Sequence, residues 1–176
     1  MTMTPDELWN EIQYCFLNDG EASLPTLELQ NLSAKEINSV YLQMRIQSQV
    51  VTPAPFFWHD VEKRNIPLDD VANAAELVVS GQAAPFSFTV EAIQIDDVIL
   101  PMLTIEIFQD TVAISFSTRD HWNALRACAF FSWLSFLLDG TQAGQLVVSA
   151  VNGPPDHKRF TQAWNRFIND SGRAEQ

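Results

Sequence analysis

The apolar run ALRACAFFSWLSFLL, residues 124–138, constrains the fold more than any other stretch of the sequence. As a helix it spans roughly 22 Å, against about 30 Å for the hydrocarbon core of a bilayer, and it contains Arg126, Ser132 and Ser135. It is apolar on nearly every side, so the protein must cover it from more than one direction. The sequence therefore predicts a buried helix over about 120–138 that crosses the inner face of a sheet.

Alternation of apolar and polar residues indicates the strands of that sheet. Residues 86–90, 103–107 and 112–116 alternate in this way. Asp96-Asp97 and Gln109-Asp110 stand where tight turns are expected. The pattern predicts an antiparallel meander with one buried face. Residues 26–30 and 145–151 are two further candidate strands.

Capping signals place three helices before the meander. Thr4 with Glu7, and Ser33 with Glu36, have the spacing of capping boxes. The first helix is expected to start at Pro5 and stop at Asp19-Gly20, and the second to reach about Gln47. Asp69 and Asp70 are expected near the start of a third helix that Gly81 ends.

A last helix is expected after Asp156, which is placed to cap it. Its inward face is predicted to consist of Phe160, Ala163, Trp164 and Phe167. The fold class that follows is a single α+β domain over residues 1–176, with an antiparallel meander packed on a buried long helix, N-terminal helices and a C-terminal helix. Residues 1–3 and 172–176 are expected to be flexible.

The charge is strongly negative and unevenly distributed. The net charge is -12, and residues 1–118 hold 4 Lys and Arg against 17 Asp and Glu. Nucleic-acid binding depends on clustered basic residues, so a nucleic acid is not an expected partner. The acidity indicates either a basic partner or a role in solubility alone.

The N-terminus and the cysteines indicate the expected cellular compartment. The N-terminus lacks the basic start and apolar stretch of a signal peptide. Cys15 and Cys128 both fall among apolar residues in predicted helices, where a disulfide is not expected. These features favour a cytoplasmic, bacterial protein that does not bind membranes. A homodimer is compatible with the sequence.

Local signatures of catalysis are absent from the sequence. His59-Asp60 and Asp120-His121 are adjacent pairs, and neighbours in an extended chain point to opposite sides. No phosphate-binding loop, dinucleotide fingerprint or serine elbow is present. No cofactor and no metal site are expected, because the three histidines lack metal-ligand spacing. Asp96, Asp97 and Asp110 are interpreted as solvated turn residues.

The stretch TPAPFFWHD, residues 52–60, has neither helical nor strand periodicity. Pro53 and Pro55 are expected to keep the chain extended from about 51 to 57, so its three rings cannot all face the same way. Two interpretations remain open: a structural clamp, or an aromatic edge beside a binding groove. The candidate binding residues are Phe56, Phe57, Trp58, His59, Asp69, Asp70, Asp96 and Asp97.

Arg159, Arg166 and Arg173 recur every seven residues on the last predicted helix. Residues at this spacing form one stripe beside the buried face. Such a stripe either pairs with the acidic body of the protein or gives the molecule a separate basic face.

Two classes of function are compatible with these features. The first is a non-catalytic acidic module that binds a basic or partly unfolded protein, in the manner of chaperone-like or toxin-neutralising proteins. The second is an enzyme or small-ligand-binding protein with a pocket near His59, Trp58 and His121. The lack of a catalytic signature favours binding and leaves catalysis open.

Overall fold

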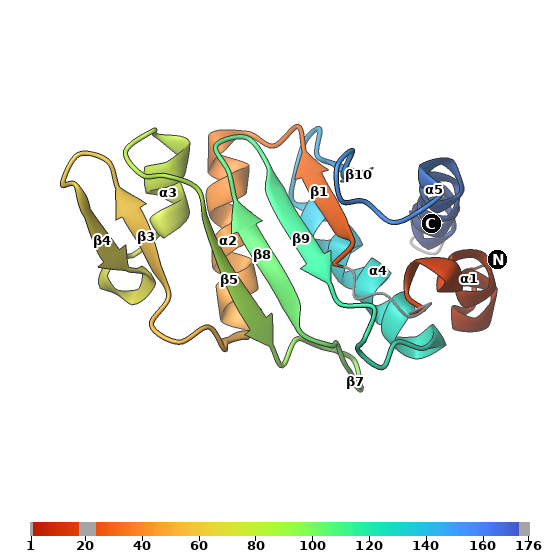
Figure 1. Ribbon diagram of the computed structural model, residues 1–176. Coiled ribbons are helices and arrows are strands. Elements are labelled where there is room, and N and C mark those ends of the chain that lie inside the picture. Colours follow the sequence, from red (N-terminus) through yellow and green to blue (C-terminus); the bar gives the residue numbers. More distant parts are fainter. Residues whose placement is uncertain (1, 18–23, 173–176) are drawn as a thin grey trace.

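The computed structural model describes residues 2–17 and 24–172 and has an α+β fold (Figure 1). Its main sheet has six strands in the order β10-β1-β9-β8-β5-β2, and all neighbouring strands are antiparallel. The strands are β1 Thr26–Gln30, β2 Gln49–Val50, β5 Phe86–Glu91, β8 Leu103–Ile107, β9 Val112–Phe116 and β10 Gln145–Val148. The predicted meander corresponds to β5, β8 and β9, and the predicted α+β class is confirmed.

The helices lie behind and beside this sheet in Figure 1. They are α1 Pro5–Ile12, α2 Ala34–Gln47, α3 Ala74–Val79, α4 Ala124–Asp139 and α5 His157–Gly172. Helices α2 and α4 cover one face, whereas no helix of the described chain crosses the front face. Helix α1 packs against both α4 and α5. None of the helices described combines the length and hydropathy that a membrane crossing requires.

The predicted caps of α1 and α2 are confirmed. In each, the N-cap hydroxyl accepts a hydrogen bond from the N3 backbone, and the N3 glutamate accepts one from the N-cap backbone. The pairs are Thr4 with Glu7 and Ser33 with Glu36. These bonds satisfy amide groups that lack partners inside the helix. The predicted stop at Asp19-Gly20 lies outside the described residues, and the α-helix itself ends at Ile12, followed by a 3-10 turn over Gln13–Cys15.

The core lies between the sheet and α2 with α4. Leu27 and Leu29, and the apolar residues of β5, β8 and β9 other than Ala113, face it and are buried. The predicted burial of α4 is confirmed for Phe130, Phe131, Trp133, Leu134 and Leu137. The predicted inward face of α5, from Phe160 to Phe167, is also buried.

Two small hairpins accompany the sheet. The strands β3 Phe56–His59 and β4 Arg64–Pro67 form one, and β6 Gln94–Ile95 with β7 Val98–Ile99 forms the other. The β3 strand lies beside the residues that lead into β5, and Ala84 N–H donates to Trp58 O at 3.0 Å.

Three local predictions are wrong. The chain is not extended throughout 51–57: Ala54 has φ +44°, although the proline that follows it favours an extended backbone at this position. Asp69 and Asp70 lie in a separate 3-10 turn, Leu68–Asp70, while α3 starts later under the cap of Asn73. Likewise α4 starts after Asn123, so the 120–121 pair precedes it.

The flexibility predicted for residues 1–3 and 172–176 stays a prediction. Met3 is buried against the core, and α5 continues through Gly172. Residues 173–176 lie outside the described chain.

Candidate functional site: the open face of the sheet

The sheet face that α2 and α4 leave uncovered, here called the open face, presents two rows of polar residues. One row crosses four strands at Thr26, Ser115, Thr104 and Thr89. Thr26 Oγ1 and Ser115 Oγ lie 2.7 Å apart, and the hydroxyls of Thr89 and Thr104 lie 3.2 Å apart. These cross-strand hydrogen bonds hold the hydroxyls in a fixed order.

The second row of the open face contains carboxylates. It runs from Val147 of β10 through Glu28 and Ala113 to Glu106 and Ser87. The six strands of the main sheet contain no Lys or Arg, and their ionisable residues are Glu28, Glu91 and Glu106. All three alternate with buried residues, so they lie on the open face. This surface is therefore uniformly acidic across the strands.

An aromatic pair borders the open face at the β3–β4 hairpin. Phe56 is 55% exposed and Trp58 41% exposed, whereas Phe57 is 1% exposed. The Phe57 ring lies 6.1 Å from Phe86 in the core, so alternation directs Phe56 and Trp58 to the other side. The expectation that at least one ring of this stretch is exposed is confirmed.

A shallow groove joins the aromatic pair to the acidic row. It has a volume of about 300 Å³ and is lined by residues 52–58 and 85–87. Thr52 is tied to the sheet, since its Oγ1 accepts a hydrogen bond from Thr89 N at 2.8 Å. Ser87, on the other wall, pairs in register with Glu106. The rings are thus held on a supported segment, in a groove whose other wall, Ser87, is the strand neighbour of Glu106.

His59 is buried and does not act with Asp60. Its Nδ1 accepts a hydrogen bond from the backbone N–H of Glu62 at 3.2 Å, while Asp60 N–H donates to Gln82 O. His59 bridges Ala83, before the start of β5, whereas His121 is exposed and follows the opposite end of the sheet, after Phe116. A pocket formed jointly by Trp58, His59 and His121 has no geometric basis.

The four aspartates named as binding candidates lie away from the open face. Asp69 pairs with Arg45 of α2 at 2.5 Å, and Asp70 is exposed in the same 3-10 turn. Asp96 and Asp97 form the turn of the β6–β7 hairpin, which packs against α4. The structure therefore brings together Phe56 and Trp58 with glutamates that were not singled out from the sequence.

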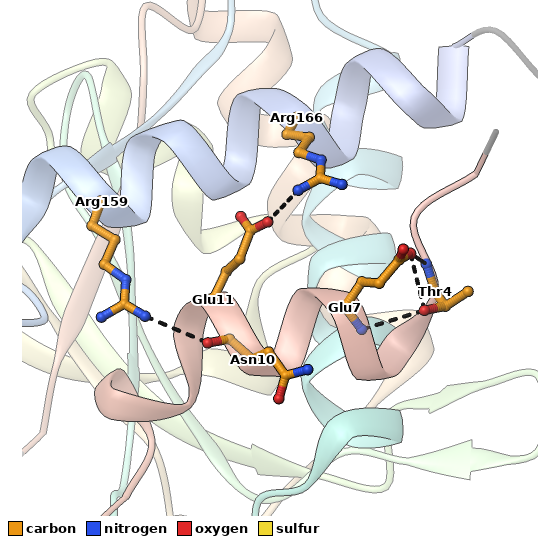
Figure 2. A network of polar contacts seen from close by, with 6 residues as sticks. All are labelled: Thr4, Glu7, Asn10, Glu11, Arg159 and Arg166. Atoms are coloured by element: carbon orange, nitrogen blue, oxygen red, sulfur yellow. Dashed lines mark hydrogen bonds and ion pairs between the residues drawn. The ribbon is translucent and has the colours of Figure 1, made fainter.

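The arginine stripe of α5 is used within the protein (Figure 2). Arg166 pairs with Glu11 of α1. Arg159 donates to Asn10 O at 3.4 Å, and its guanidinium lies 4.4 Å from the centre of the Tyr14 ring. Arg173 lies outside the described residues. Of the two interpretations, internal pairing describes Arg159 and Arg166, so the stripe does not cancel the acidity of the open face.

Neither cysteine of the described chain is an activated nucleophile, and the described residues form no metal centre. Burial raises the pKa of the Cys15 thiol to about 12, and burial also raises that of Cys128. Thiols in this state are protonated and poorly nucleophilic at neutral pH. Residues 2–17 and 24–172 contain no group of three or more His, Cys, Asp or Glu arranged to hold a metal ion.

No family model matches the sequence, and no curated protein matches it either. Among solved structures, the chain is similar to a chain of the 1.75 Å crystal structure described as the toxic C-terminal tip of CdiA from Pseudomonas aeruginosa in complex with immune protein. The two are 13% identical, the TM-score is 0.48, and the match covers 74% of this chain and 88% of that chain. At this level of identity and superposition the likeness assigns no function.

Proposed function

We propose that this protein is a non-catalytic binding protein that holds a basic partner protein against the open face of its sheet. The observation that carries the proposal is the arrangement of charge: every ionisable side chain on the main-sheet strands is a glutamate on the uncovered face. Acidic surfaces of this kind attract basic partners and accelerate their association.

The aromatic pair supplies the second element of an interface. Phe56 and Trp58 are exposed side by side on β3, and Trp58 is a residue type enriched among binding hot spots. Their strand is hydrogen-bonded on both sides, to β4 and to the residues before β5. Because the two rings are already ordered, they lose less conformational entropy when a partner binds.

Such a surface suits a folded partner better than an unfolded one. The open face is a hydrogen-bonded sheet with fixed hydroxyl and carboxylate rows, and Phe56 and Trp58 are the large apolar side chains exposed on β3 at its border. A protein that holds unfolded chains needs a larger apolar area. Neutralisation of a basic folded protein, such as a toxin, is the function we favour over a chaperone-like one.

The test compares two charge-reversal variants that change the net charge equally. Glu28→Lys with Glu106→Lys alters the open face, whereas Asp70→Lys with Asp97→Lys alters exposed residues elsewhere. Tagged wild type is used to capture a stoichiometric partner from host extract at low and at high salt. We expect a basic partner that the open-face variant loses and the control variant keeps.

Two outcomes would contradict the proposal. Equal loss by both variants would mean that net charge alone attracts the partner. Retention by a folded open-face variant would place the contact elsewhere. Melting temperatures of all variants confirm that they are folded.

A further inference from the structure

The β10 strand leaves one edge of the main sheet unpaired within the described chain. It is last in the strand order and pairs with β1 alone. In an antiparallel pair, residues alternate between those whose backbone groups face the partner and those whose groups face away. Ser149 N–H donates to Thr26 O, so by alternation Val147 bonds to β1 and the N–H and C=O groups of Leu146 and Val148 face the free edge.

The two edges of the sheet differ in how they are protected. At the other edge, β2 has two residues, and Pro53 and Pro55 follow shortly after. Short edge strands and nearby prolines prevent pairing with further strands. The β10 sequence QLVV contains no proline, lysine or other charge, and it is favourable for strand pairing. One edge is therefore blocked and the other is open.

A groove of about 690 Å³ runs along this free edge between β10, α4 and α5. Among the described residues that line it, Leu138, Leu146, Trp164 and Ile168 supply apolar walls and Asp139 is the one ionisable residue. Groove and edge together offer what a bound strand requires: main-chain partners on one side and a surface for alternate side chains.

We propose that the β10 groove receives an extended segment of a partner protein, which adds to the sheet as a seventh strand. Its side chains facing α4 and α5 are apolar, apart from a Lys or Arg that lies against Asp139 at the end of α4. Main-chain hydrogen bonds to Leu146 and Val148 provide affinity, and the groove provides specificity. This proposal is independent of the open-face site, although Val147 stands next to Glu28, so an added strand extends that face.

The net charge of the protein indicates whether a foreign segment or a second copy of this chain occupies the β10 groove. Pairing of two β10 strands joins two molecules that each carry a net charge of -12. Like charges disfavour that association, whereas a basic segment is attracted. The occupant is therefore a basic, strand-forming segment of another protein.

The test uses a defined probe, the capped hexapeptide Arg-Val-Thr-Val-Thr-Lys, in which both valines and the lysine face one side of an extended strand. It is titrated to millimolar concentration into isotopically labelled full-length protein. We expect amide shifts at Leu146 and Val148 and an indole shift at Trp164. An analogue that is N-methylated at alternate residues keeps every side chain but cannot form the ladder, so it should cause none of these shifts. Absence of shifts with the parent peptide, or shifts confined to Glu28 and Glu106, would overturn the proposal.

Two variants sharpen the result. Asp139→Lys should weaken peptide binding by about tenfold through loss of one close charge pair, whereas Asp97→Lys, which makes the same charge change in a distant turn, should not. Leu146→Pro removes an edge N–H that β1 does not use, and it should abolish binding. If the wild type instead forms a dimer in sedimentation that Leu146→Pro dissociates, a second copy is the occupant and the proposal is wrong.

Discussion

Glu36 accepts a hydrogen bond from the backbone N–H of Gln142 at 2.8 Å, although the two residues are 106 positions apart. The other carboxylate oxygen of Glu36 accepts from Ser33 N–H at 2.7 Å and closes the capping box of α2. One side chain thus caps a helix and fixes the loop that leads from α4 into β10.

We predict that this arrangement makes the fold sensitive to acid. The hydrogen bond from Ser33 N–H, and then that from Gln142 N–H, lower the pKa of Glu36 below its ordinary value of 4.5. A lowered pKa in the folded state contributes stability that is present above pH 4.5 and is lost as the pH falls through the folded value. In Glu36→Gln one acceptor oxygen is lost, so the melting temperature should fall slightly at neutral pH and vary less between pH 5 and 3. Glu91→Gln, at an exposed strand position, serves as the control.

We predict that alkaline pH destabilises the fold through ionisation of the Cys15 thiol. Burial raises its pKa from 9.0 to about 12, so its contribution to stability is complete below pH 9 and is lost as the pH rises through about 12. In Cys15→Ala this alkaline component should disappear, which thermal melts between pH 8 and 10.5 can measure. The thiol of native protein should also resist alkylation at pH 8 until the protein is unfolded. Rapid modification of Cys15 in folded protein would contradict this.

Most of the elements could be predicted because their signals are local. A capping box needs only residues three apart, as at Ser33 and Glu36, and alternation within β8 separates its buried from its outward residues. The predicted start of α3 was wrong because a competing cap was stronger. Asn73 caps α3 by accepting a hydrogen bond from Glu76 N–H, so the helix starts after Asp69.

The open face could not be predicted because it depends on strand order. Glu28 and Glu106 are neighbours in one row only because β1 inserts beside β9 and pairs on its other side with β10. Alternation predicts that each glutamate points outward, but it does not predict which strands become adjacent. The β3–β4 hairpin was not predicted either. Hairpin turns with positive φ are usually recognised by a glycine or asparagine, whereas this turn has Lys63 at φ +54°.

Helix α4 offers a test of the core with a control on the same helix. Leu134 is fully buried, whereas Phe136 is 47% exposed. Leu134→Asp should abolish folding, because an unpaired buried charge costs at least several kcal/mol and whole domains are stable by about 5–15 kcal/mol. Phe136→Asp should remain folded. Circular dichroism distinguishes these outcomes, and a folded Leu134→Asp protein would refute the position of α4 in the core.

Removal of metal ions should leave the protein unchanged. The described residues bring together no metal-binding group of His, Cys, Asp or Glu, and a structural zinc site requires about four such ligands. We expect elemental analysis of purified protein to show no stoichiometric transition metal, and we expect a chelator to leave the melting temperature unchanged. One tightly bound metal per chain would contradict this prediction.

The last prediction separates the two faces of β3. Phe57 is buried against Phe86, so Phe57→Ala should cost about 3–5 kcal/mol of stability. Phe56 and Trp58 project from the opposite side, so Phe56→Ala and Trp58→Ala should each change stability by less than about 1 kcal/mol. Urea denaturation of the three variants measures these differences.

We expect the exposed rings, which matter little for stability, to matter most for partner binding. Trp58→Ala should weaken capture of the partner by about tenfold or more, as expected for a hot-spot aromatic, while its melting temperature stays that of the wild type. Val61→Ala is a suitable control, because Val61 is 71% exposed just beyond β3 and lies outside the groove that Phe56 and Trp58 line. If Trp58→Ala and Phe56→Ala both bind the partner as tightly as the wild type, the stretch at residues 52–60 is a structural clamp and the aromatic pair is not part of the interface.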